Sequence, residues 1–329
     1  MKQKILIVGP GNMGQLTASR VLASDNYELV NYFIGAPSDH GKIVTITWGD
    51  HLIQDYPTYD FLHLIEERVN LIKDEKPIII DLTHKDAVKD NWNNYYKEWG
   101  CPVVFVTIGI RKEDIVGHQA PVIIGSPNLC GPIISLFKFF NGLAEGAMYG
   151  IVYFNVESHQ KTKQEASGTE KRFSELFRKA GAVTLYPVQM VRDEESQRAL
   201  GIPKEFLGGH GWHFCTFEPA TKSDSDYRSY MKFKESFEEC MQSLKTTYPH
   251  LVDYSVNRRT DMFLFNEDGT LCIGYERLSW DAFRFFTKIN GRASYIDELF
   301  RRVLPAMVDM VEQGKNEKMD MFDLQQEHR

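Results

Sequence analysis

Lys4-Ile5-Leu6-Ile7-Val8-Gly9-Pro10-Gly11-Asn12-Met13-Gly14 is the stretch that predicts the fold of the first part of the chain. It combines a buried strand, a G-x-G-x-x-G turn and the start of a helix over residues 15–22. The first glycine allows the tight turn, the second lets the backbone approach a pyrophosphate, and the third lets helix and strand pack closely. The pattern favours dinucleotide binding by Gly9, Gly11, Asn12, Met13 and Gly14. The alternative is a glycine-rich turn that binds no ligand.

Further apolar strands follow the first, separated by helices. We expect strands at residues 28–34, 78–84, 102–106 and 120–124, and a helix at residues 59–73. Strands that are apolar on both faces are typical of a parallel sheet covered by helices. The fold class is therefore α/β, with a Rossmann-type doubly wound parallel sheet whose ligand crevice lies at the carboxyl ends of the strands. Residues at these ends are predicted to contact the cofactor, namely Thr83, Thr107, Gly109 and Asn128.

The end of the second strand bears on the choice between NADH and NADPH. An acidic residue about 20 residues past the glycines would hydrogen-bond the ribose 2′-OH of NADH. The chain has Ile34-Gly35-Ala36-Pro37-Ser38 at this place, with Asp39 further on. Ser38, His40 and Lys42 could accommodate a 2′-phosphate instead. The sequence thus favours NADPH without excluding NADH.

A polar stretch at residues 157–169 follows another predicted strand, at residues 149–156. Ser167 and Glu170 have the spacing of a capping box, and apolar residues at helical intervals follow, so a helix is predicted to begin here. The N–H groups at a helix start suit an anion. Ser167, Gly168 and Thr169 are accordingly predicted to bind a carboxylate.

His159 and Lys163 lie on the loop that leads to this helix start. They could supply positive charge and a proton to a bound anion. The alternative interpretation is a solvated polar loop that ends in a well-capped helix.

Several segments, in the same order, resemble the 4-hydroxy-tetrahydrodipicolinate reductase family, also called the dihydrodipicolinate reductase family, and its plant-type branch in particular. The segments are Gly9-Pro10-Gly11-Asn12-Met13-Gly14, Ile80-Asp81-Leu82-Thr83, Thr107-Ile108-Gly109, Glu157-Ser158-His159-Gln160 with Lys163, Ala166-Ser167-Gly168-Thr169, Gly209-His210-Gly211 and Asn290-Gly291-Arg292. The chain differs from the family's long signature at Glu165, where the family has aspartate. It also has Ile108 where the family usually has a second threonine.

The resemblance implies an NAD(P)H-dependent reduction of a cyclic unsaturated dicarboxylate, 4-hydroxy-tetrahydrodipicolinate, to tetrahydrodipicolinate in lysine and diaminopimelate biosynthesis. His159 and Lys163 match the catalytic positions, with Lys163 as the proton donor, and Gln160, Ser167, Gly168 and Thr169 match substrate-binding positions. Two alternatives stay open. One is a diverged reductase of another small oxo or imino acid, and the other is an inactive nucleotide-binding regulatory protein.

The resemblance also suggests two domains. Residues 1–130 are expected to form the dinucleotide-binding domain, completed by a C-terminal helix and tail at about 295–329. Residues 131–294 are expected to form an α+β domain with an open mixed sheet for substrate binding and oligomerisation. It carries an insertion at about 216–279, for which we predict a helix followed by a hairpin.

Composition narrows the remaining possibilities. The chain of 329 residues has a formal net charge of −7, which disfavours nucleic acid and anionic membranes as partners. No apolar run approaches the roughly 20 residues of a membrane helix. The first strand begins at once, with no signal or transit segment ahead of it, so a cytoplasmic location is expected. The 5 cysteines are scattered without a C-x-x-C pair, so we predict no disulfide framework and no metal site. A homo-oligomer, dimer or tetramer, is expected.

Overall fold

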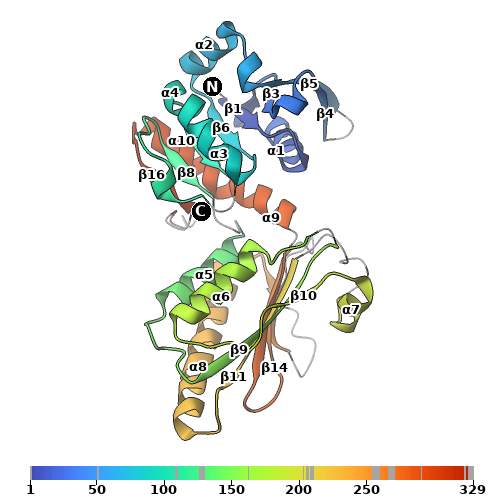
Figure 1. Cartoon of the computed structure of the whole chain (residues 1–329), viewed down its shortest axis with the longest axis vertical. Helices are drawn as coiled ribbons and strands as arrows, with labels where there is room; N and C mark the ends of the chain where they lie inside the picture. The colour runs from blue at the N-terminus through green and yellow to red at the C-terminus, as the bar shows by residue number, and fades with distance from the viewer. Residues whose placement is uncertain are drawn as a thin grey trace. The chain divides into compact units, whose positions relative to one another are not determined.

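The computed structural model describes the chain except for residues 1, 50–51, 108–109, 126–129, 162, 203, 205–206, 208–210, 254–259, 266–270, 290, 322–323 and 325–329. The predicted cofactor contacts Gly109 and Asn128 lie outside the described residues, as does Ile108. The chain divides into two compact units (Figure 1). Unit 1 is Met1–Leu129 with Ile296–Arg329, and unit 2 is Cys130–Tyr295. Each unit is described by itself.

Unit 1 is built on a sheet of strand order β16-β8-β7-β6-β1-β3-β5-β4, with β2 beside β1. All neighbouring strands are parallel except β4 and β5. The bounds are β1 Gln3–Val8, β2 Tyr27–Leu29, β3 Phe33–Gly35, β4 Ile43–Trp48, β5 Leu52–Asp60, β6 Ile78–Asp81, β7 Val103–Phe105, β8 Val122–Ile124 and β16 Lys318–Asp320. The C-terminal strand β16 lies beside β8, as its red colour next to green shows in Figure 1.

Helices and short helical turns connect these strands. Between β1 and β8 they are α1 Asn12–Leu22, η1 Pro37–Asp39, η2 Phe61–His63, α2 Glu66–Glu75, α3 Lys85–Asn91, η3 Trp92–Tyr96, α4 Lys97–Trp99 and η4 Lys112–Asp114. Near the C-terminus, α9 Gly291–Glu298, η6 Leu299–Val303 and α10 Leu304–Glu312 follow one another directly. The alternation of parallel strands and helices confirms the predicted α/β class with a Rossmann-type sheet.

Two sequence expectations for unit 1 were wrong in detail. The strand expected at residues 28–34 is split into β2 and β3. Ile5 pairs with Leu29 but Val8 pairs with Ile34, so an advance of three residues along β1 is matched by five on the other side. The two extra residues interrupt the ladder.

The helix expected at residues 59–73 begins only at Glu66, because residues 59 and 60 end β5. Strands β4 and β5 form an antiparallel pair that the sequence analysis missed. Tyr56, Thr58 and Asp60 are buried while their neighbours are more exposed, which is the period-2 pattern of a strand. Parallel pairing of β5 with β3 then fixes this segment in the sheet.

Unit 2 contains a mixed sheet of strand order β10-β9-β11-β15-β14-β13-β12. Among its described strands, β9 and β10 pair in parallel and the other neighbours pair antiparallel. The bounds are β9 Ile151–Ser158, β10 Gln189–Val191, β11 Gly211–Pro219, β12 Val252–Asp253, β13 Thr260–Phe265, β14 Leu271–Arg277 and β15 Phe283–Ile289. The helices are α5 Gly131–Gly142, α6 Gly168–Lys179, α7 Glu194–Ala199 and α8 Asp224–Thr247, of which α5, α6 and α8 lie on one side of the sheet in Figure 1. The open mixed sheet was predicted and is confirmed.

The segment that the sequence analysis treated as an insertion contributes α8 and several strands of this same sheet. Helix α8 spans Asp224–Thr247, a longer helix than the apolar face at residues 233–248 indicated. Strands β13 and β14 pair antiparallel, as predicted. Because β14 also pairs with β15, the segment is an integral part of the sheet of unit 2.

The core of unit 2 is a cluster of phenylalanine rings around Phe285. This residue is fully buried, and its ring centroid lies 5.2 Å from that of Phe173, 5.4 Å from that of Phe237 and 6.0 Å from that of Phe217. These rings come from β15, α6, α8 and β11, so one cluster joins the sheet to its helices. Edge-to-face and offset arrangements of this kind stabilise a core beyond the area that they bury.

Replacing Phe285 with alanine should therefore destabilise unit 2 strongly. We expect Phe285→Ala to lower the free energy of unfolding by about 3–5 kcal/mol, the usual cost of deleting a buried phenylalanine ring. Urea unfolding followed by circular dichroism measures it. Trp280→Ala is the control because that ring is 70% exposed, and it should change stability by no more than about 0.5 kcal/mol. Equal losses in both variants would contradict the central place of Phe285.

Candidate functional site

The three glycines of the turn after β1 have three different environments. Gly9 has φ +105°, and a Cβ there would lie 3.0 Å from the carbonyl of Leu82. A Cβ on Gly14 would lie 2.0 Å from the carbonyl oxygen of Gly9, so the third glycine allows α1 to pack against the turn. A Cβ on Gly11, by contrast, would meet nothing within 4 Å. The turn thus leaves open space where the dinucleotide motif needs room for a pyrophosphate.

Asn12 and Met13 form the first turn of α1 directly after Gly11, which is the N-cap residue. Asn12 is exposed and Met13 is half-buried. The N–H groups of a first helical turn have no partner inside the helix, and the helix dipole adds positive potential there. This end of α1 therefore has the chemistry of an anion site.

Ser38 lies on the turn η1, which is adjacent to the glycine-rich turn. A Cβ on Gly35 would lie 3.0 Å from Cβ of Asp39 and 3.2 Å from Cδ of Pro10, so the two turns are in close contact. Ser38 itself is exposed. The ammonium of Lys42 lies 2.8 Å from Asp39 Oδ1 and so already has an anionic partner.

Thr83 and Thr107 lie side by side at neighbouring strand ends. The hydroxyl of Thr107 donates to the carbonyl of Thr83 at 2.5 Å. Thr83 in turn donates its N–H and its hydroxyl to Asp81 Oδ1, at 2.8 and 2.6 Å. The other oxygen of this fully buried carboxylate accepts from the Tyr96 hydroxyl at 2.7 Å and from Asn91 at 3.2 Å. Asp81, which the sequence analysis did not select, thereby fixes the end of β6.

In unit 2 the centre of the candidate site is Glu157, near the end of β9. Its side chain is fully buried. Oε1 accepts from the guanidinium of Arg192 at 2.5 Å, and Oε2 accepts from the N–H of Ser167 at 2.7 Å. Burial alone would raise the pKa of Glu157, but the hydrogen bonds from Ser167 and the neighbouring His213 and His159 hold it below its ordinary value. The carboxylate is thus ionised at neutral pH.

The predicted capping box at the start of α6 is only half formed. Ser167 Oγ accepts from the N–H of Glu170 at 3.1 Å, as expected. The Glu170 carboxylate, however, accepts from Asn155 at 2.6 Å and from Ser174 at 2.8 Å. Glu157 takes the N–H of Ser167 in its place. A substrate carboxylate bound at the start of α6 would therefore lie at a helix end where the Glu157 carboxylate already accepts one N–H.

Arg192, which directly follows β10, holds the loop between β9 and α6 in place. Besides Glu157, its guanidinium donates to the carbonyls of Lys163 at 2.7 Å, Glu157 at 3.1 Å and Glu165 at 3.3 Å. The sequence analysis missed this residue. A polar side chain at the carboxyl end of a strand was the available signal, because β10 runs parallel to β9 and ends beside it.

The His159 imidazole lies against the backbone at the start of β11. A Cβ on Gly211 would come within 2.6 Å of Cε1 of the ring, so only glycine leaves room for the imidazole there. The backbone of His159 is fixed by hydrogen bonds to Val191 at 3.2 Å and from the Gln197 amide at 2.9 Å. His159 Nε2 is buried and has no hydrogen-bond partner among the described residues.

Both histidines of the site are neutral at neutral pH. Burial lowers the pKa of His159 to about 4. The negative charge of Glu157 alone would raise this pKa, but the positive charges of Lys163 and Arg192 lower it. Burial also lowers the pKa of His213 to about 3. His213 Nε2 lies 2.8 Å from Ser167 Oγ, which ties the histidine to the helix start.

Lys163 lies half-buried on the same loop, with its N–H bonded to the carbonyl of Gln160 at 2.9 Å. In the part of the chain that the structure describes, its ammonium makes no hydrogen bond or ion pair. Gln160 is exposed, Gly168 is half-buried and Thr169 is buried in the first turn of α6. Unit 2 thus brings together His159, Lys163 and the helix start, a combination that can hold an anion and transfer a proton.

The predicted residues fall into two groups. The described cofactor-binding candidates all belong to unit 1, whereas the catalytic and substrate-binding candidates all belong to unit 2. All cysteines are free thiols, and four of them are buried. Among the described helices, none is long and apolar enough to cross a membrane.

Comparisons with known proteins agree with the resemblance noted in the sequence. Residues 3–120 match the family described as "Dihydrodipicolinate reductase, N-terminus". A rice (Oryza sativa subsp. japonica) protein named probable 4-hydroxy-tetrahydrodipicolinate reductase 1, chloroplastic, is 34% identical over 144 residues, which are 41% of this chain and 42% of that protein. An Arabidopsis thaliana protein named 4-hydroxy-tetrahydrodipicolinate reductase 2, chloroplastic, is 27% identical over 221 residues, which are 64% of this chain and 61% of that protein. The alignments thus span about half the length of these relatives.

Among solved structures, the dipicolinate-bound dihydrodipicolinate reductase from Paenisporosarcina sp. TG-14 aligns with a TM-score of 0.43 at 19% identity, over 74% of this chain and 96% of that one. The likeness to this family depends on the sequence matches and not on this superposition. Residues 3–120 of unit 1 match the model of the family's N-terminal domain, which is a nucleotide-binding domain of the NAD(P)H type. The resemblance predicted from the sequence is confirmed.

The glycine environments predict different effects of two alanine substitutions. Gly14→Ala should lower the free energy of unfolding by about 1–3 kcal/mol, because the new Cβ collides with the Gly9 carbonyl. Gly11→Ala should change stability by less than about 1 kcal/mol but weaken NAD(P)H binding at least tenfold, roughly 1.4 kcal/mol, because the methyl group occupies the open space. Urea unfolding and fluorescence titration measure the two effects. Unchanged NAD(P)H affinity in Gly11→Ala would exclude this turn from the cofactor site.

The lowered histidine pKa values predict a loss of stability in acid. A histidine with a pKa of about 4 in the folded state and 6.5 when unfolded binds more protons in the unfolded state, so stability falls as the pH drops from 6.5 towards 4. For His159 this amounts to about 2 kcal/mol between pH 7 and pH 5. His159→Gln should reduce the difference in unfolding free energy between these pH values by about 1–2 kcal/mol. His84→Gln, a substitution of an exposed histidine, serves as the control, and an unchanged difference in His159→Gln would refute the prediction.

Proposed function

We propose that this chain, whose residues 3–120 match the model of the dihydrodipicolinate reductase N-terminus, is an NAD(P)H-dependent reductase of 4-hydroxy-tetrahydrodipicolinate that forms tetrahydrodipicolinate in lysine and diaminopimelate biosynthesis. The observation that carries the proposal is the arrangement in unit 2. His159 and Lys163 lie on one loop, and Arg192 and Glu157 hold that loop beside the start of α6. The relatives that match the chain are named as reductases of this substrate.

The charges of unit 2 suit a dicarboxylate. Lys163 is a cation with no anionic partner among the described residues, and the first turn of α6 adds N–H groups and a positive helix end. Gln160, Ser167, Gly168 and Thr169 are the proposed substrate contacts. Because a dianion loses its hydration on binding, it needs fixed cationic and N–H partners of this kind.

Bound NAD(P)H would supply the hydride to a ring carbon of the substrate. The atom that becomes electron-rich then needs a proton, and we assign its delivery to Lys163. The 4-hydroxyl group of the substrate leaves as water, so that hydride, proton and water together account for the conversion to tetrahydrodipicolinate. His159 is neutral and its buried Nε2 has no hydrogen-bond partner among the described residues, so this nitrogen is available to hydrogen-bond the substrate at neutral pH. Arg192 acts on the reaction indirectly, because it positions the loop that carries both residues.

The cofactor site belongs to unit 1. The glycine-rich turn and the first turn of α1 would hold the pyrophosphate through Gly9, Gly11, Asn12, Met13 and Gly14, and the ends of β6 and β7 would contact the nicotinamide half through Thr83 and Thr107. Gly109 and Asn128 complete the proposed set. The absence of an acid at the end of β3, together with Ser38 on η1, supports NADPH over NADH.

Assembly and location are part of the same proposal. We propose that unit 1 binds the cofactor, that unit 2 binds the substrate and forms a homo-oligomer, dimer or tetramer, and that the protein acts in the cytoplasm. The rice and Arabidopsis relatives are named as chloroplastic, so the location is a point on which this chain would differ from them.

Two alternative functions are each supported by a feature of the chain. Ile108, where the family usually has threonine, favours a diverged reductase of another small oxo or imino acid. An inactive nucleotide-binding regulatory protein would also retain the turn of unit 1. The fixed positions of both His159 and Lys163 count against it.

Lys163→Ala tests the proposal directly. Loss of a positioned proton donor should lower kcat by roughly 10²–10⁴-fold. The assay follows NADPH oxidation with freshly generated 4-hydroxy-tetrahydrodipicolinate. Lys161→Ala is the matched control, because Lys161 is an exposed lysine on the same loop, and it should retain nearly full activity.

Three outcomes would change the assignment. Full turnover by Lys163→Ala would remove Lys163 from the mechanism. Turnover of another oxo or imino acid, but not of the lysine intermediate, would favour the diverged reductase. NADPH binding without turnover of any such acid would favour the regulatory protein.

A further inference from the structure

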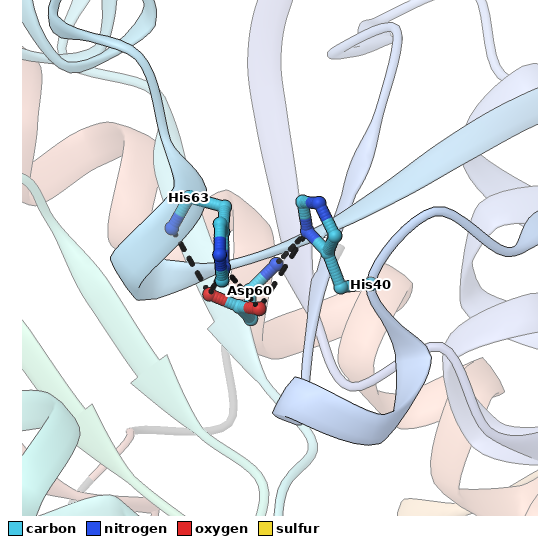
Figure 2. A group of neighbouring side chains, drawn as sticks. All are labelled: His40, Asp60 and His63. Carbon is cyan, nitrogen blue, oxygen red and sulfur yellow. Dashed lines mark hydrogen bonds and ion pairs between the residues drawn. The ribbon is translucent and has the colours of Figure 1, made fainter.

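His40, Asp60 and His63 form a cluster in unit 1 that the proposed reaction does not use. Asp60 is the last residue of β5, and its side chain is only 3% exposed. Figure 2 shows the two imidazoles approaching this carboxylate from η2 and from the end of η1. His63 Nδ1 lies 2.8 Å from Oδ1 and 2.7 Å from Oδ2, whereas His40 Nδ1 lies 3.6 Å from Oδ2.

The distances within the cluster match those between ligands of a single ion. One nitrogen from each histidine and one oxygen from Asp60 lie within 4.8 Å of one another. The His40 contact of 3.6 Å is too long for a hydrogen bond. Two ligand atoms about 2.0–2.1 Å from a tetrahedral zinc ion are separated by about 3.3 Å, so the His40–Asp60 spacing is close to that of a bound ion.

Backbone hydrogen bonds fix the orientation of the Asp60 carboxylate. The N–H groups of Leu62 and His63 donate to Oδ1 at 2.8 and 3.0 Å, which leaves Oδ2 directed at the two rings. Such supporting bonds orient a ligand before the metal arrives.

The two rings already converge without bonding to each other. Their centroids are 4.3 Å apart, with 37° between the ring planes. The His40 and His63 side chains are 37% and 61% exposed, so solvent reaches both rings. His40 Nδ1 also accepts from the Asp60 N–H at 3.4 Å, a long contact that a bound ion would replace. His63 can move by the few tenths of an ångström that metal binding requires, because its side chain is not enclosed.

A second cluster of the same residue types shows why this one suits a cation. In unit 2, Glu157, His159 and His213 also bring three donor atoms within 4.8 Å. There, however, Arg192 donates to Glu157 Oε1 and the Ser167 N–H donates to Oε2, so both carboxylate oxygens already have donors. The positive charge of the guanidinium would also repel a metal cation. Asp60, by contrast, pairs with no lysine or arginine within the described chain; its only ion-pair partners there are His40 and His63.

We propose that His40, Asp60 and His63 form a binding site for a divalent transition-metal ion of the zinc type, with His40 Nδ1, Asp60 Oδ2 and His63 Nδ1 as ligands. Imidazole nitrogen and carboxylate oxygen are ligands that zinc accepts at tetrahedral sites. Three protein ligands leave the fourth position to water or to a small anionic ligand. None of the three ligands belongs to the catalytic or substrate-binding residues proposed in unit 2, and the sequence analysis had predicted no metal.

Zinc titration of the full chain tests the proposal. After treatment with a chelator, isothermal calorimetry should show one Zn²⁺ bound per chain, and Co²⁺ should give the visible absorption of a four-coordinate ion. His40→Gln and His63→Gln should each weaken Zn²⁺ binding by at least about 100-fold, the upper end of the cost of losing an outer-shell partner. Asp60→Asn should also weaken Zn²⁺ binding. Because Asp60 caps η2, this variant could unfold. The variants of the two exposed histidines then still test the proposal.

Two controls distinguish this site from other histidines. His84→Gln alters an exposed histidine that lies 3.0 Å from Asp86, and His159→Gln alters the cluster of unit 2, and both should bind Zn²⁺ like the wild type. The proposal is overturned if the wild type binds no Zn²⁺. It is also overturned if His40→Gln and His63→Gln both bind as tightly as the wild type, or if His159→Gln abolishes binding.

Discussion

The buried ion pair between Glu157 and Arg192 is the interaction on which the candidate site depends. The Glu157 carboxylate has no exposure to water, so its charge is tolerable only because Arg192 and the Ser167 N–H satisfy both oxygens. The same guanidinium also bonds the carbonyls of Lys163 and Glu165, so the charge pair and the path of the loop are coupled. Removing either partner would leave a buried charge unpaired and the loop without its anchor.

This pair also determines which groups can carry charge during a reaction. Arg192 and Lys163 place two cations near His159, and together with burial they keep its imidazole neutral. A neutral imidazole and a cationic lysine can have different roles. The lysine can attract an anion and donate a proton, and the histidine can form a hydrogen bond. Had Glu157 lacked Arg192, its full negative charge would favour the protonated histidine instead.

The sequence predicted those parts of the molecule whose chemistry is local. The turn at Gly9, Gly11 and Gly14 and the capping of α6 by Ser167 are set by residues within a few positions of one another, and both were identified correctly. The hairpin of β4 and β5 was missed because β5 contains Pro57 and several polar residues. Its strand character comes from pairing with β4 over residues 52–57 and with β3 over residues 58–60, which sequence periodicity does not reveal.

The missed site residues share a physical cause. Arg192 acts on a loop that is 27 to 35 positions away in the chain, and His213 reaches Ser167 across 46 positions. Tertiary pairing of β9 with β10 and β11 brings them together. The capping box also failed at Glu170 for this reason, because Asn155 of β9 offered its carboxylate a closer partner. Long-range contacts of this kind cannot be predicted from spacing in a single sequence.

The two clusters of histidine and carboxylate show that residue type alone does not define a site. Each has two imidazoles and one carboxylate within the reach of a single ion. In unit 2 an arginine neutralises the carboxylate, and the surplus positive charge of Lys163 makes the surroundings attractive to anions. In unit 1 the partners of the Asp60 carboxylate among the described residues are histidines and backbone N–H groups, so its charge is left for a cation. The partner of the carboxylate, rather than the ligand set, decides the sign of the ion that each cluster favours.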